Sequence, residues 1–331
     1  MRSAATLVFA ALAAAAPAPS DIEKRQAVND GVILNYALTL EHLENAFYKQ
    51  GLQQISAEDF YKATGDKMFY NNLKEISKDE QTHVTFLSGA LKAAGVTPTQ
   101  PCTYNFGFKD APTFLAIANV LEGVGVSAYL GAAQFIMNKD YLTAAGSILT
   151  VEARHSAYLR ENQDPAQSPF PAAFDIPLDF DEVYSLAAQF IKSCPASNPK
   201  LPVVAFPAIT VAPAGVAKPG DKLSFTVAKS VDAKAAYFIT SMGPVSAQLS
   251  GSGTKYTVVV PSGAQPGQEY VVLTKDSNKP TDDNIVAGPA VVQVADNAYG
   301  QDEGHEHGYG HGHPQGYGGW GKKDDHKPEG Y

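Results

Sequence analysis

Two segments with the same pattern decide how the first half of the chain is interpreted: Glu80-Gln81-Thr82-His83 and Glu152-Ala153-Arg154-His155. Residues three apart lie on one face of an α-helix, so each glutamate and its histidine can contact the same bound ion. One Glu-x-x-His segment arises often by chance. Two of them within one long helical region are much more specific, and they predict a metal site built by several helices.

Each Glu-x-x-His segment is preceded by a helix that carries a glutamate within an apolar stripe. These glutamates are Glu41 and Glu122, and each is followed seven residues later by a tyrosine, Tyr48 and Tyr129. The equal spacing indicates an internal repeat of two helical hairpins. The repeat selects Glu41 as the equivalent of Glu122, and Glu44 stays as an alternative or additional ligand because it lies on nearly the same face.

Hydrophobic periodicity and helix-breaking residues divide the chain into parts. Residues 29–194 are predicted to be helical, with Gly51 ending the first helix and Asp140 capping the fourth. The long helices are expected at about 30–50, 66–94, 112–137 and 140–161, a short one begins after Ser56, and a last helix covers 181–193. After a linker at 195–202, seven short apolar runs within 203–295 predict an immunoglobulin-like β-sandwich.

Four carboxylates buried in a helical bundle would be very unfavourable without cations. Two divalent metal ions remove that penalty, and oxygen ligands with one imidazole for each ion suit iron or manganese. The predicted ligands are Glu41, Glu80, His83, Glu122, Glu152 and His155.

The stretch from Asn35 to Tyr48, NYALTLEHLENAFY, resembles the opening of a ferritin-like family that includes secreted fungal stress-response and sexual-development proteins and plant desiccation-related proteins. Ser168-Pro169-Phe170-Pro171 and a last helix ending at Cys194 are similar to the fungal branch. The resemblance implies a four-helix bundle with a di-metal centre.

Two functions are compatible with this resemblance. The first is redox chemistry on oxygen or peroxide, like that of a ferroxidase or a manganese catalase, in a stress response. The alternative is a non-catalytic structural or sequestering protein of a cell wall or surface, which uses the bundle as a scaffold.

The N-terminus predicts secretion. Residues 1–16 have one positive charge, an apolar run and small residues, which is typical of a signal peptide, and residues 17–25 end in the dibasic pair Lys24-Arg25 expected of a propeptide. An extracellular or cell-wall location favours a disulfide between Cys102 and Cys194, with two buried free thiols as the alternative.

Composition excludes some classes of partner. The net charge of −9 disfavours binding to nucleic acid, and no segment after the signal peptide has the length and apolar composition of a transmembrane helix. Residues 296–331 are rich in His, Gly and Tyr and are expected to be a disordered tail. Cell-wall association and formation of a homodimer are left open by the sequence.

Overall fold

The computed structural model describes residues 28–296. The predicted signal peptide, the predicted propeptide and the predicted tail, apart from its first residue, lie outside the described residues.

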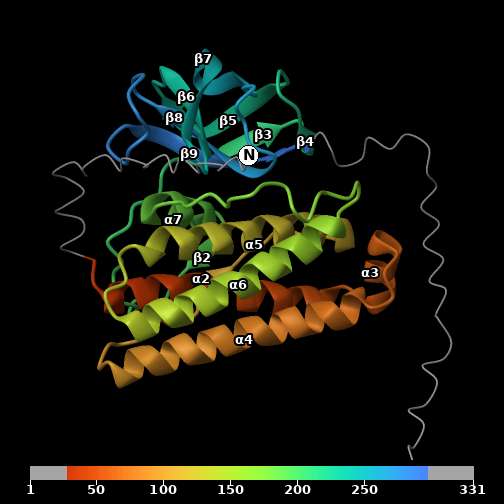
Figure 1. The fold of residues 1–331 in the computed structure, drawn as a ribbon, viewed down its shortest axis with the longest axis vertical. Helices are drawn as coiled ribbons and strands as arrows, with labels where there is room; N and C mark the ends of the chain where they lie inside the picture. The colour runs from red at the N-terminus through yellow and green to blue at the C-terminus, as the bar shows by residue number, and fades with distance from the viewer. Residues whose placement is uncertain (1–27, 297–331) are drawn as a thin grey trace, which may run out of the picture. The chain divides into compact units, whose positions relative to one another are not determined.

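The first part of the described chain is helical. Four long helices, α2 (Asp30–Gln54), α4 (Phe69–Ala93), α5 (Ala111–Ala133) and α6 (Lys139–Glu161), lie side by side in a bundle (Figure 1). Two shorter helices, α3 (Ala57–Thr64) and α7 (Phe180–Ala188), accompany them. Helix α2 packs against α4, and α5 packs against α6, so the bundle consists of two hairpins.

The first helix does not end at Gly51, as the sequence predicted, but continues to Gln54. Gly51 is needed for packing instead, because a Cβ atom at this position would lie 2.0 Å from Cε2 of Phe114. The N-cap of α6 is Asn138 and not Asp140, since the Asn138 side chain accepts hydrogen bonds from the backbone N–H groups of Asp140 and Tyr141.

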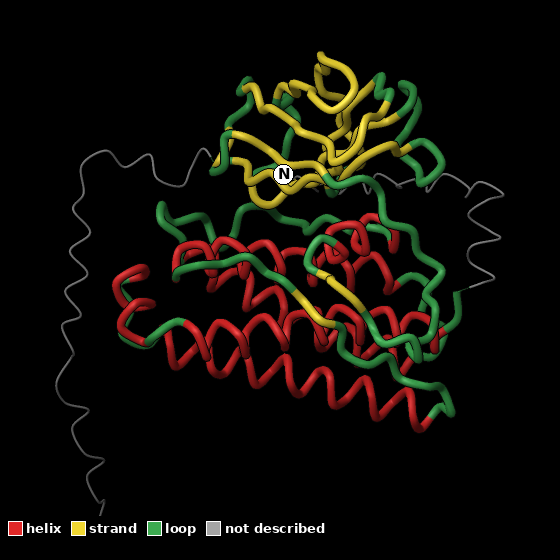
Figure 2. Tube along the Cα trace, turned by 180° about the vertical axis from the view of Figure 1, so that it is seen from behind, coloured by secondary structure: helices red, strands yellow, loops and turns green. Residues whose placement is uncertain are grey.

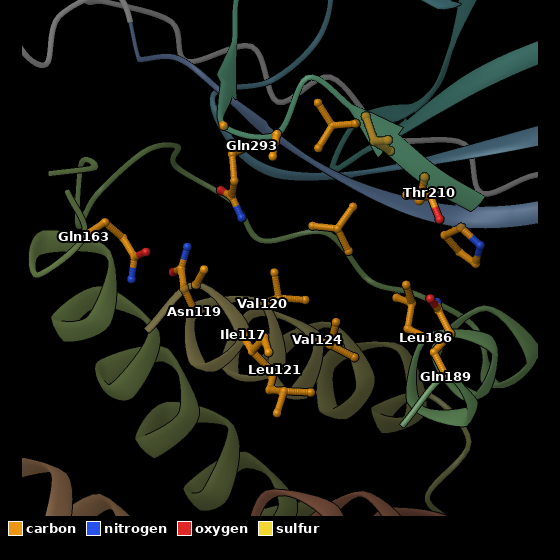
Figure 3. A pocket seen from close by; sticks show the side chains of 18 of the residues that line it. Ile117, Asn119, Val120, Leu121, Val124, Gln163, Leu186, Gln189, Thr210 and Gln293 are labelled. Carbon is orange, nitrogen blue, oxygen red and sulfur yellow. The ribbon is translucent and has the colours of Figure 1, made fainter. Parts of the chain in front are cut away.

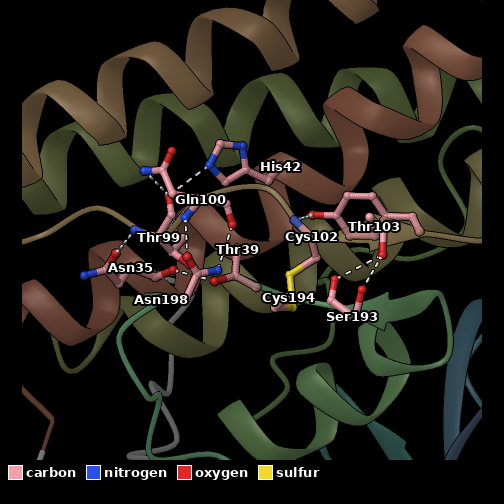
Figure 4. The surroundings of a disulfide bond; sticks show 11 residues. Asn35, Thr39, His42, Thr99, Gln100, Cys102, Thr103, Ser193, Cys194 and Asn198 are labelled. Atoms are coloured by element: carbon pink, nitrogen blue, oxygen red, sulfur yellow. Dashed lines mark hydrogen bonds between the residues drawn. A yellow bond between two sulfur atoms is a disulfide. The ribbon is translucent and has the colours of Figure 1, made fainter. Parts of the chain in front are cut away.

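The predicted last helix is also shorter than expected. It ends at Ala188, and residues Ile191–Ser193 form strand β2, which pairs with β1 (Thr103–Tyr104). Figure 2 shows this two-stranded ribbon against the helices. The disulfide between Cys102 and Cys194 is present beside the ribbon, where the Thr103 and Ser193 hydroxyl oxygens lie 2.7 Å apart (Figure 4).

The second part of the described chain is β-rich and forms one curled seven-stranded sheet in the order β3-β5-β7-β6-β8-β9-β4. All neighbours pair antiparallel except β4 and β9. Strand β7 is longer than the short runs that the sequence predicted: it covers 17 residues and pairs with β6 near its start and with β5 near its end. The strands are β3 (Ile209–Ala212), β4 (Val216–Ala217), β5 (Lys222–Val231), β6 (Ala235–Thr240), β7 (Gly243–Val259), β8 (Gly267–Thr274) and β9 (Ile285–Val294).

The sheet contacts the helical part through α5 and through α7, which packs against β9. The buried hydroxyl of Tyr270 on β8 donates to the carbonyl of Gly123 at 2.9 Å and lies 2.8 Å from the Ser127 hydroxyl. By length and composition alone, helix α5 could cross a membrane. However, 72% of its most apolar 18-residue stretch is buried inside the protein. We therefore interpret α5 as a buried helix of the bundle, which packs against α6, α7 and α2.

Candidate metal centre

All six predicted ligand side chains come together in the middle of the bundle. They form two overlapping groups, and within each group one candidate ligand atom from every residue lies within 4.8 Å of the others. Glu80 and Glu152 belong to both groups. The first group also contains Glu41 and His83, and the second contains Glu122 and His155. The four carboxylates are 0% exposed, so the cluster is shielded from solvent.

In the first group, three carboxylates surround one imidazole nitrogen. Nδ1 of His83 lies 3.2 Å from Oε2 of Glu41, 3.4 Å from Oε2 of Glu80 and 3.5 Å from Oε1 of Glu152. A single nitrogen cannot donate good hydrogen bonds to three acceptors. The convergence of four donor atoms from α2, α4 and α6 is instead the arrangement that a cation between them would stabilise.

The second group repeats this arrangement. Nδ1 of His155 lies 3.2 Å from both Oε1 of Glu80 and Oε2 of Glu122. The other ring nitrogen, Nε2, lies 3.3 Å from Oδ2 of Asp79. Metal-bound histidines commonly use their second nitrogen to contact a carboxylate, which holds the ring in place.

Two buried tyrosines cross between the hairpins. The Tyr48 hydroxyl of α2 donates a hydrogen bond to Oε1 of Glu122 on α5, and the Tyr129 hydroxyl of α5 donates to Oε1 of Glu41 on α2. The repeat seen in the sequence is thus also a repeat of contacts. A further tyrosine, Tyr158 of α6, donates a hydrogen bond to Oδ2 of Asp66 at 3.1 Å, outside the cluster.

Burial dominates the electrostatics of the cluster. Burial raises the pKa of Glu41 to about 8 and holds the pKa of Glu152 well above its usual value. For Glu80 the effect of burial is outweighed by hydrogen bonds from the two histidines, which lower its pKa to about 2. Burial also disfavours the charged histidines, but their carboxylate neighbours raise the pKa of His83 to about 10 and that of His155 to about 11.

The donor set fits a pair of divalent cations. Both carboxylate oxygens of Glu152 are buried without a hydrogen bond, a situation that is costly unless a cation is bound. Among the described residues, the ion pairs of the four carboxylates are all with His83 and His155. Oxygen ligands with one imidazole for each group suit iron or manganese better than a soft metal.

Glu44, the alternative ligand, is buried but belongs to neither group. It borders the cluster across Gly125: a Cβ atom at Gly125 would lie 2.7 Å from Oε2 of Glu152 and 3.1 Å from Oε1 of Glu44. His42 is outside the cluster, and its Nε2 lies 3.1 Å from the carbonyl oxygen of Thr99 (Figure 4).

Two residues of the centre were not predicted. Asp79 precedes Glu80 on a half-exposed position of α4, and its contact with His155 joins two helices that are distant in sequence. Gly125 lies three residues after Glu122, and it leaves space for the Glu152 carboxylate. The adjacent acids Asp79-Glu80 were a weak signal for the first residue, and a glycine one turn after a predicted ligand was a weak signal for the second.

Comparisons with known proteins agree with this geometry. The ferritin-like domain family matches residues 29–164. Protein rds1 of Schizosaccharomyces pombe is 29% identical over 179 residues, which cover 53% of this chain and 42% of that protein. The match therefore spans less than half the length of this relative. Residues 29–164 of the helical part are thus similar to the ferritin-like domain family, and the buried cluster of acids and histidines is compatible with a di-metal site.

Proposed function

We propose that the protein binds two divalent ions of iron or manganese and uses them for redox chemistry on oxygen or peroxide. The observation that carries the proposal is the pair of overlapping ligand groups that share Glu80 and Glu152. In the part of the chain that the structure describes, two imidazoles are the partners of four fully buried carboxylates, which therefore need further positive charge. Two divalent ions supply it.

The residues of the cluster have distinct roles in this proposal. Bound iron or manganese would supply the one-electron chemistry that protein side chains lack. Glu80 and Glu152 belong to both groups and would be shared by the two ions. Glu41 and Glu122 would each serve one ion, and a tyrosine hydroxyl restrains each of them. Asp79 orients the imidazole of His155 through Nε2.

Metal analysis of the purified protein tests the binding. After loading with Fe(II) or Mn(II), the wild type is expected to retain two ions per chain, and Glu80→Gln is expected to lose both because both groups contain Glu80. Glu75→Gln is the matched control, since Glu75 lies on the same helix with a side chain that is 70% exposed. Substoichiometric metal in the wild type, or equal retention by both variants, would contradict the proposal.

The redox activity needs its own test. Fe(II) is added to the protein without oxygen, oxygen is then admitted, and a ferric absorption band is followed. The band is expected to form faster with wild type than with Glu80→Gln, and at the same rate with Glu75→Gln. If metal binds but oxidation is no faster than in buffer, the scaffold function remains and the redox function is rejected.

We also propose that the protein is secreted and acts in an extracellular response to oxidative stress. The disulfide supports this location, because disulfides persist in oxidising compartments. We also propose that the curled sheet belongs to the immunoglobulin-like sandwich class, because it has seven mostly antiparallel strands, and that it has a wall-associated role. Mass spectrometry of the secreted protein is expected to find Gln26 as the first residue, and an intact Met1 would contradict this.

A further inference from the structure

A cavity of about 680 Å³ lies where α5 and α7 face strands β3, β4 and β9 (Figure 3). Its volume is in the range of sites that bind small organic molecules. Part of its wall comes from the bundle, including Ile117, Val120 and Val124, and part from the β-rich region, including Val211 and Val291. Neither part alone encloses the cavity.

The wall chemistry restricts the ligand. Most lining side chains are aliphatic, and the acids among them are Glu44 and Asp164. In the described part of the chain, no lysine, arginine or histidine lines the cavity. An anionic ligand would therefore find no counter-charge there, and the wall favours an uncharged, largely apolar molecule.

One polar atom in the wall, Oδ1 of Asn119, receives no hydrogen bond from any described residue. Asn119 is 3% exposed, and its Nδ2 donates to Oε1 of Gln167 at 3.2 Å, while its Oδ1 is buried without a hydrogen bond. Figure 3 shows the Asn119 side chain directed into the cavity, together with those of Gln163 and Gln293. Gln293 is already satisfied, because it accepts from Arg160 and donates to Gln268.

A buried acceptor without a donor is costly, and a ligand that brings an O–H or N–H group removes the cost. The cavity wall also includes Glu44 and Gly125, and both border the Glu152 carboxylate of the candidate metal centre. A molecule in the cavity is thus separated from the centre by these two residues.

We propose that this cavity binds an uncharged, largely apolar organic molecule with a hydroxyl group, which donates a hydrogen bond to Oδ1 of Asn119. Its position beside Glu44 and Gly125 makes it a candidate organic substrate of the metal centre. That second part rests on the proposed function, whereas the binding site itself does not.

Fluorescence titration of the metal-free, full-length protein with 2-naphthol tests the binding site, and 2-methoxynaphthalene serves as the matched ligand without a donor. Wild type is expected to bind 2-naphthol more tightly. Asn119→Leu keeps the size of the side chain but removes the acceptor. It is expected to weaken 2-naphthol about threefold to tenfold, the effect of one neutral hydrogen bond, and to leave 2-methoxynaphthalene unchanged.

A second pair of variants tests whether the ligand binds in this cavity. Val120→Trp fills the cavity and is expected to abolish binding of both ligands. Val204→Trp is the control, since Val204 is 65% exposed and does not line the cavity. Absence of binding by wild type, binding that survives Val120→Trp, or equal affinity for both ligands in wild type and Asn119→Leu would each overturn the proposal.

The link to the metal centre is tested by NMR of 2-naphthol with protein loaded with Mn(II) or Mg(II). Paramagnetic broadening of the bound ligand by Mn(II), absent with Mg(II), is expected. If the protein retains neither Fe(II) nor Mn(II), the proposed function fails, while the fluorescence titration still decides whether the cavity binds the ligand. If Mn(II) binds and the ligand resonances are unaffected, the ligand does not lie beside the centre.

Discussion

Replacement of Gly125 by alanine perturbs the centre without removing a ligand. The added Cβ atom would lie 2.7 Å from Oε2 of Glu152, about 0.7 Å closer than an ordinary van der Waals contact of 3.4 Å. The Glu44 carboxylate blocks one direction of escape, since its Oε1 would be 3.1 Å from the same atom. The Glu152 carboxylate must therefore move away from its place between the two ligand groups.

Two opposing effects determine how much Gly125→Ala changes the free energy of unfolding. A helical Gly→Ala change in open space stabilises a protein by about 1 kcal/mol, and overpacking a buried site costs about 1–3 kcal/mol. Gly89→Ala and Gly146→Ala provide the reference, because a Cβ atom at either position would meet nothing within 4 Å. Gly125→Ala is expected to be less stable than these controls by about 1–3 kcal/mol. Its Mn(II) affinity is expected to fall about tenfold to a hundredfold, as when the residues that support a metal ligand are changed.

Thermal denaturation of the metal-free proteins measures the first effect, and calorimetric titration with Mn(II) measures the second. The controls should gain stability and bind Mn(II) like wild type. If Gly125→Ala gains as much stability as Gly89→Ala, the Glu152 carboxylate does not occupy the space that we describe. If Gly125→Ala is destabilised but binds Mn(II) normally, Glu152 is not a ligand.

Three other perturbations have defined outcomes. Tyr48→Phe and Tyr129→Phe should each lower the free energy of unfolding by about 1.5–3 kcal/mol, because each removes a hydrogen bond to a buried carboxylate; clearly unequal losses in urea denaturation would contradict the equivalence of the hairpins. Replacing Cys102 and Cys194 by serine should cost about 2–5 kcal/mol, because the disulfide closes a loop with a sequence separation of 92, and an unchanged denaturation midpoint would disprove this. Burial raises the pKa of Glu269 to about 8 from 4.5, so the stability gained from its neutral form is complete below pH 4.5 and is lost as the pH rises through 8. Glu269→Gln should remove this decline, up to about 5 kcal/mol, and equal pH profiles for variant and wild type would refute it.

The bundle and the cluster were predictable because their signals are local and periodic. Glu80 with His83, and Glu152 with His155, are each placed on one helix face by the helical repeat alone. The seven-residue spacing from Glu41 to Tyr48 recurs in the next hairpin and identifies the partner helix. These features need no knowledge of distant contacts.

Other features depend on contacts between residues far apart in the sequence. A glycine such as Gly51 is a common signal for the end of a helix. The reason for a glycine here is instead the ring of Phe114 from another helix, which leaves no space for a Cβ atom. The adjacent acids Asp79-Glu80 draw attention to Asp79, but the sequence does not show that its partner is His155. Gly251 and Gly253 lie in the middle of β7, and the sequence does not show that pairing with β6 and β5 makes this stretch one long strand.

The crossed tyrosine contacts also bear on the history of the chain. They are the pattern expected if one ancestral hairpin was duplicated and the two copies were joined in tandem. Each hairpin contributes a tyrosine hydroxyl that donates a hydrogen bond to a glutamate of the other hairpin. A substitution at Tyr48 therefore affects Glu122, and a substitution at Tyr129 affects Glu41. Substitutions in one hairpin would then be constrained by the partner residue in the other hairpin, and the two halves of the gene would evolve together.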